Sequence, residues 1–108
     1  MKAPPFPPGL TAGDVVRCAR VAQGIGLRAM CRATGMSPTA LSHLETNRPG
    51  TSVSAETLAL LARHLMLDPW ELMLRDGRVP AEFIDALRRD PTRGAALLRA
   101  TAAMVGAS

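Results

Sequence analysis

Aromatic residues are nearly absent from this sequence, which has two Phe, one Trp and no Tyr among 108 residues. The runs of aromatic and β-branched residues that are typical of strands are missing as well, which argues against a β-sheet fold. Apolar residues nevertheless make up 47% of the chain. The core must therefore consist of Leu, Val, Ala and Met, and the composition predicts one all-α domain with a short appendage at most.

Cysteine is also scarce, and the pair Cys18 and Cys31 has neither a CxxC spacing nor a matching histidine pattern. This excludes a disulfide framework and a zinc site. No apolar run approaches the roughly 18 residues that span a bilayer, and no signal peptide opens the chain. We expect a cytoplasmic protein with reduced cysteines, no metal or other cofactor, and no membrane contact.

Arrangements of side chains that carry catalysis are missing too. The sequence has no nucleophile with a matching base, no glycine-rich phosphate loop before a helix, and no pair of carboxylates suited to acid–base chemistry. We therefore expect that the protein is not an enzyme.

Negative charge is scarce in the first part of the chain. Residues 1–48 contain six cationic and two acidic side chains, whereas residues 49–108 contain seven of each. The net charge of +4 thus arises in the first part. A basic region beside a neutral one indicates an anionic partner that docks on one face, although a generally basic small protein would have the same net charge.

Helical spacing of apolar residues, together with capping signals, predicts seven short helices. Their expected ranges are about 12–23, 27–34, 38–46, 55–65, 69–76, 80–89 and 91–105. The proline-rich residues 1–10 predict a flexible arm ahead of them. Residues 11–76 are thus expected to form a five-helix bundle, followed by two additional helices in a C-terminal extension over 77–108.

The same spacing predicts which side chains face the core. The candidates are Val15, Val16, Ala19, Ala22, Met30, Cys31, Leu41, Leu44, Leu58, Leu61, Ala62 and Leu65, with Met66, Trp70 and Met73 as further core residues. Capping signals mark four helix starts, one of which is Ser54 before the helix expected at 55–65. Thr11 precedes a first turn that holds Asp14, and Ser37 precedes Pro38. Asp68 and Glu71 have the spacing of a capping box.

Two of the predicted helices lie close together in the chain. "LRAMCRAT" and "PTALSHLET" are joined by a short turn that contains Gly35, which is the pattern of a helix-turn-helix. In such a motif the outer face of the second helix enters the major groove of DNA, about 12 Å wide, while the first helix crosses the backbone. Small residues such as Cys31 and Ala40 permit the close crossing of the two helices.

The stretch "DVVRCARVAQGIGLRAMCRATGMSPTALSHLETNR", followed by "ETLALLARHLMLDPWELM", resembles the Cro and lambda-repressor-like family of Xre-type transcriptional regulators. The resemblance covers about residues 12–75. It implies a five-helix domain that binds double-stranded DNA in a sequence-specific way, usually as a homodimer on a palindromic operator. A repressor is the preferred interpretation.

The resemblance also implies roles for individual residues. Arg20 and Glu45 match a buried ion pair that joins the first and third helices. The positions that read bases are Pro38, Thr39, Ala40, Ser42 and His43, where Pro38 can only pack against a base. The positions that contact phosphates are Arg28, Arg32, Thr46, Asn47 and Arg48.

The sequence departs from the family pattern at the start of the second helix. Gly26 and Leu27 stand where the family often has Ser-Gln, so phosphate contact there must come from backbone N–H groups or from Arg28. The second helix of the motif also has few long polar side chains, which leaves room for shape readout or modest specificity.

Residues 77–108 lie outside the resemblance. Their apolar stripes are interpreted as a dimerisation or partner-binding surface, while packing on the chain's own first part remains an alternative. Two further hypotheses remain open for the whole chain. One is an antitoxin that represses its own operon and binds a toxin through the C-terminal helices, and the other is a protein-interaction module that has lost DNA binding.

Overall fold

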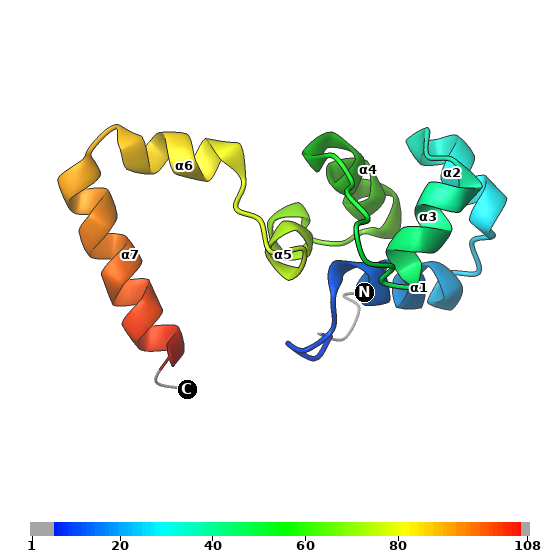
Figure 1. The fold of residues 1–108 in the computed structure, drawn as a ribbon, viewed down its shortest axis with the longest axis horizontal. Coiled ribbons are helices and arrows are strands. Elements are labelled where there is room, and N and C mark those ends of the chain that lie inside the picture. The colour runs from blue at the N-terminus through cyan, green and yellow to red at the C-terminus, as the bar shows by residue number, and fades with distance from the viewer. Residues whose placement is uncertain (1–5, 107–108) are drawn as a thin grey trace. The chain divides into compact units, whose positions relative to one another are not determined.

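The computed structural model describes residues 6–106, and within this range the chain is helical without strands. Seven helices are present in it: α1 (Ala12–Ala22), α2 (Leu27–Thr34), α3 (Pro38–Glu45), α4 (Ala55–Leu65), α5 (Pro69–Arg75), α6 (Ala81–Arg88) and α7 (Pro91–Gly106) (Figure 1). The all-α prediction is therefore confirmed. The chain divides after Arg78 into two compact units, which are described separately below.

Local capping explains why α1, α3 and α4 begin where they do. Thr11 and Asp14 form a reciprocal capping box at α1. At α3 the Ser37 hydroxyl accepts from the backbone N–H of Ala40. Ser54 caps α4 in the same way by accepting from the N–H of Thr57. Each side chain satisfies a backbone donor that the first helical turn leaves without an intrahelical partner.

The first unit is built around an aliphatic core. Its buried side chains come from α1 to α5 and include Val15, Val16, Ala19, Met30, Leu41, Leu44, Leu58, Leu61, Ala62, Leu65, Leu72 and Met73. The approach of α1 to α3 is so close that a Cβ atom on Gly13 would lie 1.9 Å from the carbonyl oxygen of Leu44. The lack of a side chain at Gly13 therefore permits this helix crossing.

Three predicted core residues lie on the surface instead. Ala22 is exposed at the end of α1, and Met66 and Trp70 are 83% and 43% exposed. Met66 ends α4 with a left-handed backbone conformation, at φ 59°, which directs the chain away from the helix axis. In α5 the buried side chains are Leu72 and Met73, and Trp70 in the first turn of the helix stays partly exposed.

The capping box predicted at α5 is formed on one side only. An Asp68 carboxylate oxygen accepts from the N–H groups of Trp70 and Glu71. The Glu71 carboxylate accepts instead from the guanidinium of Arg75, with an Nη2–Oε1 distance of 2.9 Å.

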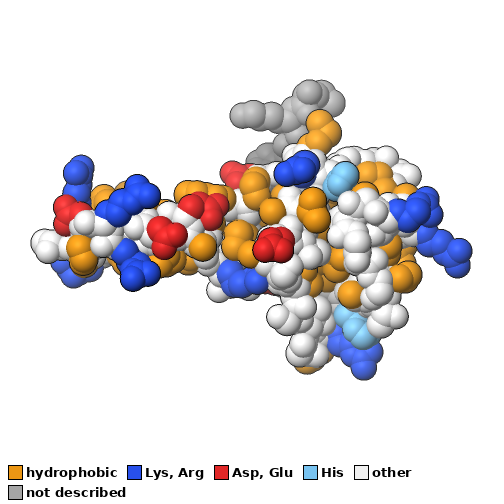
Figure 2. Space-filling view, turned by 90° about the horizontal axis from the view of Figure 1, so that it is seen from above, with side chains coloured by type: hydrophobic (Ala, Val, Ile, Leu, Met, Phe, Trp, Pro, Cys, Tyr) orange, Lys and Arg blue, Asp and Glu red, His pale blue; other side chains and the backbone are white. Residues whose placement is uncertain are grey.

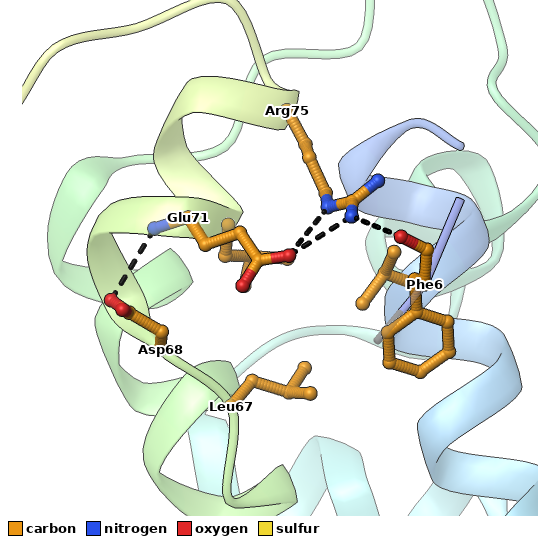
Figure 3. Close-up of a pocket in the computed structure, with 7 residues that line it drawn as sticks. Phe6, Leu67, Asp68, Glu71 and Arg75 are labelled. Atoms are coloured by element: carbon orange, nitrogen blue, oxygen red, sulfur yellow. Dashed lines mark hydrogen bonds and ion pairs between the residues drawn. The ribbon is translucent and has the colours of Figure 1, made fainter. Parts of the chain in front are cut away.

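The segment 6–10, part of the predicted flexible arm, lies against the first unit. Arg75 donates to the backbone carbonyl oxygens of Phe6, Pro7 and Leu10. The ring of Phe6 lines a small cavity together with Leu67 and the Glu71–Arg75 pair (Figure 3). An arginine with five donors can hold three carbonyls and a carboxylate together, so this part of the arm is fixed by hydrogen bonds that the sequence pattern does not show. The arm prediction for residues 1–5 lies outside the described residues.

The second unit consists of α6 and α7. A Cβ atom on Gly94 would lie 2.8 Å from the carbonyl oxygen of Leu87, so the two helices pack closely at their junction. Among the described residues of α6 and α7, Gly94 alone is buried. Ile84, Leu97, Leu98, Met104 and Val105 are exposed, whereas Phe83 and Leu87 are half-buried.

Candidate nucleic-acid interface

The helix α3 is held by α1 and α2 so that one of its faces remains on the surface. The α2–α3 turn begins at Gly35, which has a left-handed backbone at φ 75° and accordingly no side chain. Leu41 and Leu44 turn the opposite face of α3 into the core, where they are 0% and 6% exposed. This is the arrangement of a helix-turn-helix, with α3 as the projecting second helix.

Arg20 and Glu45 lie together between α1 and the end of α3. Arg20 Nε donates to Glu45 Oε2 at 2.7 Å, and Arg20 Nη2 donates to Oε1 at 2.8 Å. The third arm of the guanidinium, Nη1, donates to the carbonyl of Ile25 at 2.9 Å. Hydrogen bonding to Glu45 raises the pKa of Arg20 above its usual value. The pair fixes the end of α3 to α1 and to the loop before α2.

A second polar connection joins the same two helices through Asn47, directly after α3. The Asn47 amide donates to Asp14 Oδ1 at 2.7 Å and its carbonyl oxygen accepts from the Thr11 hydroxyl at 2.6 Å. Both ends of the Asn47 side chain are therefore engaged with the first turn of α1. The hydrogen bond from Asn47, followed by that from the Thr11 N–H, holds the pKa of Asp14 below its ordinary value.

The side chains expected to read bases occupy the outer face of α3. Pro38, Thr39 and Ser42 are exposed, and Ala40 and His43 are half-buried. Thr46 is exposed at the end of the helix, where its hydroxyl donates back to the carbonyl of Ser42 at 2.8 Å. Thr39 and Ser42 are thus the accessible hydroxyls of this surface, and their hydroxyl groups can both donate and accept.

His43 and Arg48 contact each other across the end of α3. Arg48 Nη1 lies 3.0 Å from His43 Nε2. Because a guanidinium can only donate, Nε2 is the acceptor in this hydrogen bond. The two side chains line two hollows, of about 210 and 270 Å³. Asn47 and Thr11 border the first hollow, and the loop 49–53 borders the second.

Arg28 and Arg32 are exposed one turn apart on α2. They border an open hollow that also includes Met36 and Pro38, at the start of α3. The two arginines therefore flank one end of α3, and Arg48 stands at the other. If such an exposed helix lies in a groove of DNA, the basic groups at its two ends can each contact a stretch of the phosphate backbone.

The structure adds residues that the sequence did not indicate as part of this site. Gly13 sets the distance between α1 and α3, and Thr11 and Asp14 bind Asn47. Asp14 and Asn47 are 33 positions apart, so no local pattern predicts their contact. A glycine in the first turn of an otherwise regular helix was the one available signal for Gly13.

The fold and the geometry of α2 and α3 define a helix-turn-helix module, a class of domain that binds DNA. A family model described as a helix-turn-helix domain matches residues 11–73. This is more than half of the chain, and the chain belongs to the helix-turn-helix domain family. No curated protein and no solved structure matches the sequence. None of the helices within residues 6–106 has the length and apolar character needed to cross a membrane.

Proposed function

We propose that the protein is a sequence-specific regulator of transcription that binds double-stranded DNA through α3, most similar in its mode of binding to the Cro and lambda-repressor-like regulators. The observation that carries the proposal is the exposed face of α3 with basic side chains at both of its ends. We further propose that it represses transcription as a homodimer, acts in the cytoplasm, and needs no cofactor or catalytic group.

The phosphate contacts are assigned to Arg28, Arg32 and Arg48, which are exposed residues. Arginine suits this task because its planar fork can bind two phosphate oxygens. Thr46 contributes from the end of α3. For Asn47 the side-chain bonds to Thr11 and Asp14, together with the bond from its backbone N–H to the Leu44 carbonyl, support a positioning role rather than a direct phosphate contact.

Base readout is assigned to Thr39, Ser42 and His43, with Ala40 and Pro38 as apolar contacts. The bond from Arg48 to His43 Nε2 supports a defined role for the histidine. With Nε2 occupied, the ring presents Nδ1–H as a donor, and the matching acceptors in the major groove are N7 and O6 of guanine, N7 of adenine and O4 of thymine. Arg48 thus contributes twice, by contacting phosphate and by fixing the histidine tautomer.

A gel shift tests the proposal directly. DNA from immediately upstream of the gene is compared with random duplex at two salt concentrations. We expect preferential binding to the upstream DNA, with affinity falling as salt increases. Failure to shift any duplex at low salt would favour the protein-interaction module instead.

The role of His43 is tested with base-substituted variants of the bound DNA. His43→Ala is expected to change relative affinities by about 1 kcal/mol or more at the base pair it contacts. The control is His64→Ala, which removes the chain's other histidine, an exposed residue at the end of α4. Equal weakening of His43→Ala on all sequences would assign His43 to the backbone rather than to a base.

A second candidate function follows from the exposed apolar side chains of α6 and α7. In an antitoxin, such a surface binds and blocks a toxin while the helix-turn-helix represses the operon. Co-purification of a second small protein encoded beside this one would favour that function.

A further inference from the structure

The helix α7 is apolar around nearly its whole circumference. From Gly94 to Gly106 it carries one charged side chain, Arg99. Leu97, Leu98, Met104 and Val105 are between 51% and 71% exposed. A helix without a polar face is a buried helix in a folded protein, so this surface needs a cover. At 16 residues the helix is too short to span a bilayer, for which about 20 are needed.

The apolar surface continues onto α6 as a groove. Ile84 and Leu87 of α6 and Pro91, Gly94, Ala95 and Leu98 of α7 line a hollow of about 280 Å³. Gly94 lies where α7 packs directly against the Leu87 carbonyl of α6. The groove and the exposed leucines thus lie on one helical hairpin, which presents both a recess and the side chains that fit such a recess.

The spacing of the apolar residues on α7 fits another helix as the cover. Gly94, Leu97, Thr101 and Met104 follow one another at intervals of three and four residues, and Leu98 and Val105 widen the same stripe. This is the seam along which helices pair in coiled coils and bundles. Two hairpins that bury such seams against each other form a four-helix bundle.

The charges of the hairpin indicate that the cover is a second copy of itself. Residues 79–108 contain three acidic and four basic side chains, Glu82, Asp85, Asp90, Arg88, Arg89, Arg93 and Arg99. Figure 2 shows acidic and basic side chains interspersed with apolar ones over these helices. Each copy therefore offers both signs to the other with little net repulsion, whereas a segment of nearly balanced charge attracts the dense negative charge of DNA only weakly.

We propose that α6 and α7 form the homodimer interface, in which the two hairpins of two chains pack into a four-helix bundle and Leu97, Leu98, Met104 and Val105 bury against the partner's groove. This proposal identifies the surface through which the proposed regulator forms its dimer. It rests on the proposed function because binding to a palindromic operator is the reason to expect a dimer. A palindromic operator needs two copies of α3 related by a two-fold axis.

Sedimentation velocity of the full-length protein at micromolar concentration tests the proposal. The wild type is expected to have twice the mass of one chain. Met104→Lys is expected to weaken dimerisation about tenfold or more, because the lysine charge would be buried in the dimer. The single chain accommodates this change, since Met104 is 71% exposed in it. Leu98→Asp is expected to abolish the dimer, and Leu98→Met to retain it.

The control variant is Glu56→Lys, a charge change at an exposed position in the first turn of α4. It is expected to leave the mass unchanged. A monomeric wild type would overturn the proposal, including the case in which the hairpin packs on its own chain. A wild-type dimer that Leu98→Asp and Met104→Lys both leave intact would overturn it as well, because the chains would then pair elsewhere.

Gel shifts on a single half-site separate this proposal from the proposed function. Half-site binding by a monomeric wild type would contradict the dimer interface and leave DNA binding in place. A dimer that depends on Leu98 but shifts no duplex would support the interface and contradict the DNA-binding function.

Discussion

Arg20 and Glu45 show how single residues set the position of the proposed interface. Their side chains are 14% and 6% exposed, and two hydrogen bonds join them. Of the three hydrogen bonds that the Arg20 guanidinium makes to Glu45 and Ile25, Glu45→Ala leaves only the bond to the Ile25 carbonyl. We expect the free energy of unfolding to fall by about 3 kcal/mol, measured by urea denaturation, because a buried charge loses its counter-charge.

The double variant Arg20→Met/Glu45→Leu serves as the control for this prediction. Replacing both charges by apolar groups removes the desolvation cost together with the ion pair, so most of the stability is expected to return. A loss below about 0.5 kcal/mol in Glu45→Ala would mean that the pair does not hold the two helices together.

Asn47 and Asp14 provide a prediction on pH. The pKa of Asp14 is lowered chiefly by the Asn47 amide. A lowered folded-state pKa stabilises the fold at pH values above the unfolded-state pKa of about 3.9, and the contribution disappears as the pH falls through the folded-state pKa. Asn47→Gly removes the amide while tolerating the left-handed backbone, which has φ 55° at this residue. We expect the pKa of Asp14 to rise in this variant.

A carboxyl NMR titration measures this pKa in the wild type and in Asn47→Gly. The stability difference between the two proteins is expected to shrink in acid, since the protonated carboxyl no longer favours the amide bond. Superimposable titration curves would show that Asn47 does not bind Asp14 in solution.

At the scale of the helices, Gly13 determines how closely α1 approaches α3. In Gly13→Ala the new Cβ would meet the Leu44 carbonyl oxygen at 1.9 Å, and backbone atoms cannot turn aside as a flexible side chain does. The helices must therefore separate, at an expected cost of about 3 kcal/mol in the free energy of unfolding. Denaturant unfolding of Gly9→Ala gives the control, because a Cβ atom there meets nothing within 4 Å. Equal stability of the two variants would contradict the close crossing.

The helices themselves could be predicted from the sequence because their signals are local. Ser37 with Pro38 begins α3 and Gly35 ends α2, and each signal acts within a few residues of its position. Trp70 shows where this approach fails. Its large apolar side chain indicates burial, but Leu72 and Met73 are the side chains that α5 buries in the core, and Trp70 is 43% exposed.

The candidate interface likewise has features that could be predicted from the sequence and features that could not. The positions on the outer face of α3 follow from helical periodicity and from the motif, so they could be named from the sequence. The long-range hydrogen-bond partners that position this interface could not be named from the sequence. The bonds from Asn47 to Thr11 and Asp14, and those from Arg75 to residues 6–10, join segments far apart in the chain and depend on tertiary packing.

At the scale of the whole molecule, the two units differ in charge and in surface. Residues 1–78 contain nine basic and six acidic side chains and so carry most of the net charge, whereas residues 79–108 are nearly neutral and expose apolar side chains. The first unit is therefore suited to an anionic partner and the second to a protein partner. This division of tasks is the one that a dimeric DNA-binding regulator requires.

If α3 and its flanking arginines bind the DNA backbone, the affinity for duplex DNA must depend on salt through these arginines. Fluorescence anisotropy at several salt concentrations gives the slope of log K against log salt for the wild type, for Arg48→Ala and for Arg63→Ala. Arg63 is an exposed arginine near the end of α4 and serves as the control. We predict that Arg48→Ala reduces the magnitude of the slope by about 1 and that Arg63→Ala leaves it unchanged. Absence of binding at low salt, or a slope that Arg48→Ala does not alter, would contradict the account.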